Sequence, residues 1–442
     1  MLSNSVSNLA TRARVVNKNV RLAIQRFTSP LYTNSMYIMG GTAATSILSF
    51  AFWMLAARNG SPEIVGVAST SISSATLLMS LCDLGLGTAL IYYSSMRQRH
   101  TTGLINSITS TGWILSGLAA LVYVIGIPYF APGLTIVREN IPIAIVFILF
   151  TVASYGITLQ DALLLSSNKA KYVFWRNIAC NLPSLLLIVP AIYLFRDFRA
   201  LLIAYCLPNI IVAVSMGLFI IPKSNPGYVL FKPIKLIDIS EFIGYGIKNY
   251  ISNIIWSIPA LVLPIIAINI SSASEAGKFF FAWTIFNFVL IIPRSITASM
   301  FVEGSRDRLM LHKIIRKSTT MIVAVALPAV ALLWVLGSYL LLLFGKEYTD
   351  TSFLRILLLS VIPFSVNSVC FIALRIKGSM LYTSGFCAML SIVVLGFIAY
   401  LSQSMGVVGL ASGWLIGQSL VALFAFVWYA CSMIMIYRSN KG

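Results

Sequence analysis

One regular row of small polar residues ends at an aspartate and could line a path for a polar solute. Its members are spaced 4, 3, 4, 3 and 4 positions apart: Ser69, Ser73, Thr76, Ser80, Asp83 and Gly87. At 3.6 residues per turn, this spacing places all six on one face of a helix. Small polar rows also form tight helix contacts in membranes, and that interpretation stays open. Asp83 favours a cavity, because a carboxylate at membrane depth costs roughly 2.5–3.5 kcal/mol. We expect it either to pair with a cation in the cavity or to exchange a proton in ion coupling.

Two basic residues lie deep inside apolar stretches, and each shares a helix face with residues that could bind a polar ligand. Lys248 is followed at helical spacing by Ser252 and Trp256, with Asn249 and Asn253 beside them. In the next stretch the corresponding residues are Trp283, Asn287 and Arg294. An arginine can hold a phosphate through two parallel hydrogen bonds, whereas a lysine acts as a mobile point charge. We expect both cations to line a cavity and attract an anion; the alternative is that they extend to the membrane interface.

The remaining reactive residue types form no catalytic or metal-binding pattern. All six cysteines fall in apolar stretches without a CxxC spacing, and His100 and His312 are far apart in the sequence. This pattern predicts no metal site, no disulfide and no cofactor. Asp161 is expected either to pair with Lys169 and Lys171, in the loop that follows it, or to contribute to ion coupling.

These residues belong to a chain that is too apolar for a soluble protein. Of its 442 residues, 59% are hydrophobic and 10% are charged, against about 25% charged in ordinary globular chains. Apolar stretches of 20 or more residues recur, each long enough to cross a hydrocarbon layer of roughly 30 Å. The predicted spans are 37–57, 64–93, 103–127, 142–166, 174–195, 200–221, 244–270, 278–302, 319–344, 354–376, 379–402 and 406–437. The sequence therefore predicts an all-α, multi-pass membrane protein with about twelve transmembrane helices.

Basic residues are distributed unevenly between the two sides of these spans. With the N-terminus in the cytoplasm, 22 of the 31 Lys and Arg lie on the inner side, 7 on the outer side and 2 within spans. The positive-inside rule then places both termini in the cytoplasm and the protein in the cell (cytoplasmic or inner) membrane. We interpret the net charge of +19 as a topology signal with affinity for anionic lipid, and expect no nucleic acid. Residues 303–318 mix basic and apolar residues, which predicts a helix lying on the inner interface.

The two halves of the chain show a weak internal repeat. Residues 57–66 follow the first span and residues 269–277 follow the seventh, so that Gly66 and Gly277 lie 211 positions apart. Because six spans is an even number, both halves have the same orientation and form a parallel 6+6 repeat about an axis along the membrane normal. We expect two six-helix bundles around a central cavity. The predicted parts are a basic N-terminal segment (1–36), the two bundles (37–221 and 244–437), a cytoplasmic linker between them (222–243) and a cytoplasmic tail (438–442).

Three short segments carry a family resemblance. They are Ala57-Arg58-Asn59-Gly60-Ser61-Pro62-Glu63-Ile64-Val65-Gly66, Asp83-Leu84-Gly85-Leu86-Gly87 and Ser274-Glu275-Ala276-Gly277-Lys278-Phe279. They resemble the lipid-linked oligosaccharide flippases of polysaccharide export (Wzx-type), within the multidrug/oligosaccharidyl-lipid/polysaccharide exporter superfamily. The resemblance implies transport of a polyprenyl-diphosphate-linked oligosaccharide from the inner to the outer leaflet. For such a substrate we expect Lys248 and Arg294 to hold the diphosphate, and the Asn, Ser, Thr and Trp residues named above to line the cavity near the glycan.

Two other functions stay open on the sequence. A multidrug/cation antiporter of the same superfamily needs acids inside the membrane, but the first span has none and the seventh has none between Lys248 and Ser271. A membrane glycosyltransferase or polymerase needs carboxylates or a metal facing its substrate, whereas the predicted outer acids are scattered over short turns. We therefore expect a transporter and not an enzyme. Its expected partners are a polyprenyl-diphosphate-linked glycan, membrane lipids and other polysaccharide-assembly membrane proteins.

Overall fold

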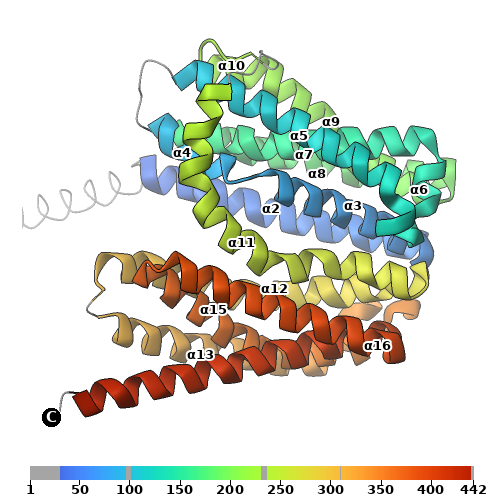
Figure 1. The fold of residues 1–442 in the computed structure, drawn as a ribbon. Coiled ribbons are helices and arrows are strands. Elements are labelled where there is room, and N and C mark those ends of the chain that lie inside the picture. The colour runs from blue at the N-terminus through green and yellow to red at the C-terminus, as the bar shows by residue number, and fades with distance from the viewer. Residues whose placement is uncertain (1–29, 96–100, 230–235, 309, 440–442) are drawn as a thin grey trace, which may run out of the picture.

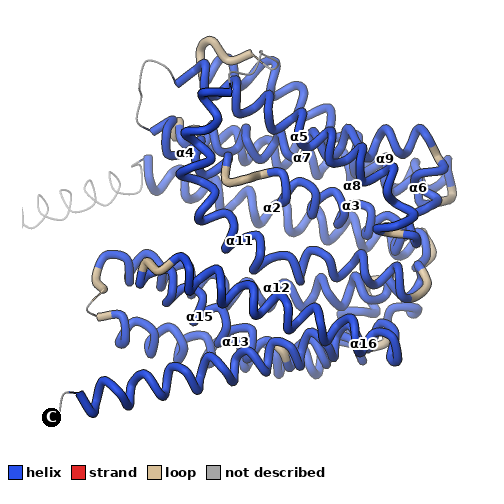
Figure 2. Tube along the Cα trace, in the orientation of Figure 1, coloured by secondary structure: helices blue, strands red, loops and turns tan. Residues whose placement is uncertain are grey.

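The computed structural model describes residues 30–95, 101–229, 236–308 and 310–439. Every regular element in these ranges is helical and none is a strand (Figure 2), which confirms the predicted all-α class. Most of the predicted N-terminal segment 1–36, part of the linker and the last three residues lie outside the described ranges.

The first half of the chain forms one bundle, drawn in blue to green in Figure 1. Its helices are α2 (Pro30–Asn59), α3 (Pro62–Cys82), α4 (Leu86–Ser95), α5 (Thr101–Phe130), the 3-10 turn η1 (Pro132–Leu134), α6 (Thr135–Glu139), α7 (Ile141–Ser166), α8 (Ala170–Phe195), α9 (Phe198–Ser215), the π-helical turn η2 (Met216–Ile220) and α10 (Ile221–Ser224). The π-helical turn joins α9 to α10 without a gap, so Phe198–Ser224 forms one continuous helical span.

The second half forms the other bundle, drawn in yellow to red, except that the first part of α11, in yellow-green, runs along the first bundle beside α4. Its helices are α11 (Leu236–Ile270), α12 (Ala273–Arg306), α13 (Leu311–Leu342), the 3-10 turn η3 (Lys346–Tyr348), α14 (Ser352–Leu359), α15 (Val361–Lys377) and α16 (Met380–Ser439). The predicted interfacial helix over 303–318 is wrong. Residues up to Arg306 continue α12 and residues from Leu311 begin α13. Leu311 and Ile314, which lie among the basic residues, are buried and belong to the packed face of α13.

Eleven helices of the described part are long and apolar enough to cross a membrane, and the twelfth crossing is contained in α16. This 60-residue helix has a non-helical residue, Gly406, with φ 56° and ψ −133°. Beyond it, a Cβ on Gly409, Gly413 or Gly417 would overlap the backbone near Leu401, Ile398 or Val394. The two halves of α16 therefore run antiparallel in close contact, and the predicted twelve spans are present.

The predicted continuous span 64–93 is broken after Cys82. Leu84 and Gly85 have φ of 45° and 78°, in the left-handed region that ends a helix. Asp83 then accepts a hydrogen bond at 3.3 Å from the amide of Gly87 in the first turn of α4. The expected single polar face from Ser69 to Gly87 therefore ends at Asp83, where the chain changes direction.

The two halves of the predicted repeat meet at one crossing of α3 and α12. Ser61 caps α3 with φ −77° and ψ 159°, and Ser272, 211 positions later, caps α12 with φ −78° and ψ 158°. A Cβ on Gly66 would overlap the carbonyl of Ala273, and one on Gly277 would overlap the carbonyl of Pro62. The helices thus touch through their backbones, as small residues allow in membrane proteins.

Further contacts join the bundles at the same end of the molecule. The Arg58 side chain donates to the Leu343 carbonyl at 2.8 Å, the Trp53 and Phe280 rings are 4.6 Å apart, and the Gly133 amide donates to Asn269. We call this the glycine end, defined by Gly66 and Gly277. At the other end lie the α7–α8 connection, α10, the α12–α13 connection and the end of α15. We call it the basic end, because these segments and the residues that flank them include Lys169, Lys171, Lys223, Arg306, Arg308, Lys313 and Lys377. In Figure 1 the bundles converge at the right, where the α3–α12 crossing lies.

We expect Gly66→Ala or Gly277→Ala to open the glycine end, because each added methyl overlaps a backbone carbonyl that cannot rotate away. A Ser69→Cys reporter, buried beside the crossing, should react with a membrane-impermeant maleimide about fivefold faster or more, the change that about 1 kcal/mol produces.

Gly396→Ala is the matched control, because nothing lies within 4 Å of the Cβ that it adds. Equal labelling rates in the Gly66, Gly277 and Gly396 variants would contradict the proposed contact.

Candidate functional site

A cavity of about 270 Å³ lies between the first bundle and α11. Its lining residues come from α3, the break that follows it, α4, α7 and α11: Met79, Ser80, Asp83, Gly85, Thr88, Tyr155, Thr158, Tyr250, Asn253, Ile254 and Ser257. Asp83 is the acidic residue among them, and Tyr155 is a fully buried tyrosine whose hydroxyl has no partner among the described residues. The cavity therefore presents polar groups from both halves of the chain.

Tyr250 ties the second half of the chain to the break in span 2. Its hydroxyl lies 2.7 Å from the Ser80 carbonyl and 2.8 Å from the Leu81 carbonyl. Both carbonyls belong to the last turn of α3, where a helix leaves its carbonyls without amide partners. The phenol therefore satisfies groups that the break exposes, and it holds α11 against the wall that contains Asp83.

An arginine from α15 reaches the same region. Arg375 donates from Nη1 to Oδ1 of Asn253 at 3.2 Å, and Asn253 lines the cavity. The Arg375 guanidinium also lies 5.1 Å from the ring centre of Phe301 and 5.4 Å from that of Phe371. Contacts of a cation with ring faces at these distances are favourable, so the aromatic rings hold the guanidinium beside the cavity.

The contacts continue from Arg375 to Arg294. Trp256 stacks on Phe371 with ring centres 4.8 Å apart and also contacts Phe364 at 5.8 Å. Arg294 lies over Phe364 at 5.7 Å. We call this group the arginine–aromatic cluster: Asn253, Trp256, Arg294, Phe301, Phe364, Phe371 and Arg375, from α11, α12 and α15.

Neither arginine of the cluster forms an ion pair with an acid whose side chain the structure describes. The ion pairs within the described ranges are Arg176–Asp161, Arg199–Asp197 and Lys278–Glu275, and none includes Arg294 or Arg375. Arg294 is exposed and Arg375 is partly buried. Uncompensated cations at membrane depth are costly and mark ligand pathways, so this cluster can bind an anion while its rings offer flat apolar faces.

The structure brings some of the predicted site residues together and separates others from the cavity. Ser80, Asp83 and Asn253 line the cavity, and Trp256 and Arg294 belong to the cluster. The side chains of Lys248 and Asn249 lie outside the described residues, although both positions are in α11.

The remaining predicted residues make packing contacts in this conformation. Trp283 lies in the core of the second bundle against Trp414, with ring centres 5.1 Å apart, and Asn287 donates to the Trp283 carbonyl. Ser252 is buried and bonds to Ser384 at 2.8 Å. The hydroxyls of Ser69, Ser73 and Thr76 donate to carbonyls of their own helix.

Asp161 forms an ion pair with Arg176 of α8, and not with the loop lysines that the sequence suggested. Both side chains are largely shielded, with 14% of Arg176 and 23% of Asp161 exposed. The pair joins α7 to α8 inside the first bundle. This geometry favours a structural role for Asp161 over a role in ion coupling.

Sequence reasoning missed three residues of the site. Arg375 lies one position before the predicted end of its span. Phe371, four residues earlier, could have indicated its role, because residues four apart on a helix are neighbours and the ring then lies next to the guanidinium. Tyr155 is the one tyrosine of its predicted span, and Tyr250 directly follows Lys248 and Asn249 in the seventh span. The sequence signal for Tyr250 was its position next to two polar residues, Lys248 and Asn249, in an otherwise apolar span.

Comparisons with known proteins agree with this architecture. The sequence profile of the family described as "Polysaccharide biosynthesis protein" matches residues 31–302, whereas curated proteins give no match. The lipid II flippase MurJ in an inward closed conformation is similar in structure, with a TM-score of 0.71, 14% identity, and coverage of 89% of this chain and 87% of that chain.

Transporters of the multidrug resistance MATE family, in the MOP superfamily, are also similar. An inward-facing structure gives a TM-score of 0.69 with 15% identity and coverage of 89% of this chain and 96% of that chain. An outward-facing structure gives 0.60 with 15% identity and coverage of 92% and 96%. These similarities establish a shared two-bundle fold.

We expect Asp161→Ala to destabilise the protein by about 1–3 kcal/mol, because it leaves Arg176 shielded and unpaired; breaking a fully buried pair costs about 3–5 kcal/mol. Arg176→Ala should have a similar effect, and the double variant should lose less stability than the sum of the two. Thermal unfolding of the purified protein measures each difference.

Lys278→Ala serves as the control, since its pair with Glu275 is more exposed and should contribute at most about 1 kcal/mol. Strict additivity of the Asp161 and Arg176 effects would show that the two charges do not stabilise each other.

Proposed function

Because the chain belongs to the polysaccharide biosynthesis protein family, we propose that it is a flippase. Its substrate is a polyprenyl-diphosphate-linked oligosaccharide, which it moves from the inner to the outer leaflet of the cell membrane. The similarity to the fold of a lipid II flippase supports this class of transport. The basic end faces the cytoplasm by the positive-inside rule, which also places both chain termini there.

The observation that carries the proposal is the unpaired positive charge of the arginine–aromatic cluster. A diphosphate bears at least two negative charges and cannot cross hydrocarbon without compensation. Arg294 and Arg375 provide two guanidinium groups without acidic partners in the described part of the chain. Lys248, predicted from the sequence on the adjacent helix, adds a third cation. Trp256 offers a ring for stacking on a sugar, and Asn253 offers hydrogen bonds to hydroxyl groups.

The mechanism follows from where the bundles touch. Contacts at the glycine end close the path toward the outer leaflet, so a substrate enters from the cytoplasmic side. The diphosphate binds between the cluster and the wall that contains Asp83, while the polyprenyl chain stays in the lipid. Rocking of the bundles then opens the glycine end and lowers the affinity of the site. Transport needs this difference, since a ligand shifts an equilibrium only through unequal affinity for its states.

Asp83 is the reason to keep a second candidate function. A carboxylate in the cavity suits a multidrug/cation antiporter, and MATE transporters share the fold. Against this candidate, the second bundle faces the region with two arginines and no acid among the described cluster residues. A cationic substrate would be repelled there. We therefore assign Asp83 to ion coupling, in which the acid binds and releases a proton or cation as the bundles rock.

Arg294→Ala and Arg375→Ala should each reduce glycan export at least about tenfold, because losing one charge-assisted contact removes about 1.5–3 kcal/mol of binding. The lipid-linked precursor should accumulate on the inner leaflet. The corresponding lysine variants should recover only part of the activity, because bidentate geometry is lost.

Arg355→Ala is the matched control, since Arg355 lies over Trp334 at 5.7 Å but belongs to the glycine end. Normal export by an Arg294→Ala/Arg375→Ala variant would overturn the proposed site.

Asp83→Asn removes the negative charge but keeps the local structure, because the amide oxygen can still accept the hydrogen bond from Gly87 in the first turn of α4. We expect the variant to insert and unfold like the parent protein but to transport slowly, with its dependence on an ion gradient lost. Transport that keeps the parent rate and gradient dependence would exclude Asp83 from coupling.

A further inference from the structure

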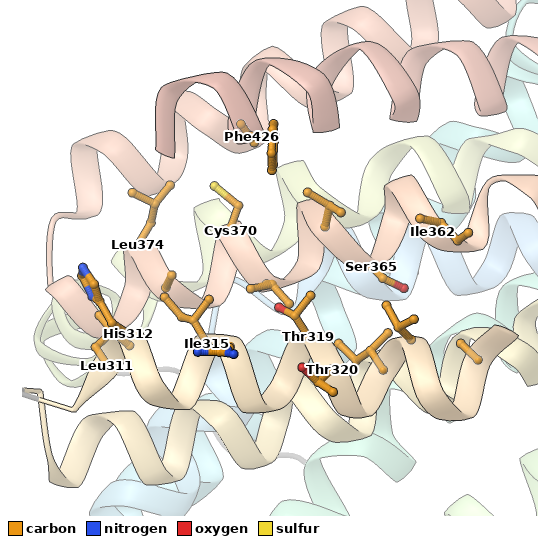
Figure 3. A pocket seen from close by; sticks show the side chains of 18 of the residues that line it. Leu311, His312, Ile315, Thr319, Thr320, Ile362, Ser365, Cys370, Leu374 and Phe426 are labelled. Atoms are coloured by element: carbon orange, nitrogen blue, oxygen red, sulfur yellow. The ribbon is translucent and has the colours of Figure 1, made fainter. Parts of the chain in front are cut away.

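A second cavity, of about 480 Å³, lies within the second bundle between α13, α15 and α16. Its volume falls in the roughly 300–1,000 Å³ range of ligand pockets. Figure 3 shows side chains from α13 and α15 along its length, with Phe426 of α16 above them. His312 and Leu374 lie at one end and Ile362 lies toward the other. We call this cavity the α13–α15 groove.

The chemistry of the groove changes along its length. At the basic end its lining includes Arg316 and Lys377, and farther along it becomes apolar with Val323, Ala326 and Leu327. None of its described lining residues is acidic, and neither Arg316 nor Lys377 forms an ion pair with a described residue. The groove is therefore cationic at one end and apolar beyond it.

The groove also opens sideways onto the apolar surface of the bundle. Val323, Leu327, Ile362 and Phe426 line it and are exposed, which places its opening against the lipid in a membrane. From Arg316 to Leu327 the helix rises about 16 Å at 1.5 Å per residue. One leaflet of the hydrocarbon layer is about 15 Å deep, half of roughly 30 Å. The groove thus matches the depth of a single leaflet.

The groove is separate from the site proposed for transport. With 100° between successive residues, Ile362, Val369 and Ala373 fall on one face of α15, and these line the groove. Phe364, Phe371 and Arg375 fall on the opposite face, and these belong to the arginine–aromatic cluster. A ligand in the groove would therefore pack against the back of the helix that presents Arg375.

We propose that the α13–α15 groove binds an anionic phospholipid of the cytoplasmic leaflet. One acyl chain lies along the apolar part of the groove, and the phosphate binds Arg316 and Lys377. Charge complementarity identifies the headgroup, because two uncompensated cations attract a net negative lipid more than a zwitterionic one. The groove is about as long as one leaflet is deep, which fits one acyl chain of a phospholipid. The bound lipid stabilises α13 against α15 and so supports the helix that carries Arg375.

Thermal unfolding of the purified full-length protein in detergent tests this proposal. Dioleoyl phosphatidylglycerol should raise Tm by about 2 °C or more, whereas dioleoyl phosphatidylcholine and inorganic phosphate should not. Arg316→Gln/Lys377→Gln should lose most of the shift. Lys313→Gln/Lys317→Gln removes two charges of α13 that do not line the groove, and it should keep the shift.

A groove-filling variant gives an independent readout with the charges intact. Val366→Trp should abolish the phosphatidylglycerol shift by occupying the space of the acyl chain. An unchanged shift in Arg316→Gln/Lys377→Gln would overturn the proposal, even if Val366→Trp fails to fold. An equal shift with phosphatidylcholine would refute the headgroup, an equal shift with phosphate would refute a lipid ligand, and a larger shift with a polyprenyl phosphate would assign the groove to the transported lipid.

Discussion

The backbone contact between α3 and α12 is the constraint on which the arrangement of the two bundles depends. Gly66 and Gly277 each leave room for a carbonyl of the other helix, so the helices approach more closely than any side chain would permit. Each helix begins with a serine cap of nearly the same geometry, which fixes where the crossing lies along the axis. The Tyr250 hydroxyl joins the halves again at the last turn of α3, but the α3–α12 contact, so near the helix starts, is what holds the glycine end together. Such a contact is suited to alternate opening, because it is small and contains no fixed ion pair.

Charge divides the two faces that meet at the centre. The first bundle contributes Asp83 at a broken helix, and the second contributes Arg294 and Arg375 held over aromatic rings. A positively charged face whose arginines form no ion pair with a described residue is unfavourable in a membrane unless an anion binds to it. The excess of positive charge on the second bundle favours a diphosphate over a cationic drug as the substrate. In this proposal the arginines bind the diphosphate, whereas Asp83 takes part in ion coupling. Arg176 differs from these two arginines, because it forms an ion pair with Asp161 within the first bundle.

The architecture could be predicted from the sequence because the length of an apolar stretch reports membrane crossing directly. The matching turns before Gly66 and Gly277 likewise predicted the repeat, since helix caps have a strong local signature. The site was harder to predict. A transmembrane helix is apolar on most sides, so spacing alone could not tell that Trp283 faces the core while Trp256 faces the cluster. The break after Cys82 had a local signal in Gly85, which takes the left-handed backbone there, but the apolar residues on both sides of it favoured one continuous span. Arg375 was not predicted as a site residue, because the predicted end of its span is uncertain by a few residues and Arg375 lies next to that end.

In the proposed transport cycle the glycine end must open for a lipid-linked oligosaccharide to reach the outer leaflet. Cysteines at positions 58 and 343, where the Arg58 side chain meets the Leu343 carbonyl, can be joined by a short bis-maleimide in a background without the six native cysteines. The decisive measurement is movement of a labelled polyprenyl-diphosphate-linked oligosaccharide between the leaflets of reconstituted vesicles. We predict that complete cross-linking stops this movement, while modification of either single cysteine leaves it intact. Continued movement in the fully cross-linked protein would show that transport does not require the glycine end to open.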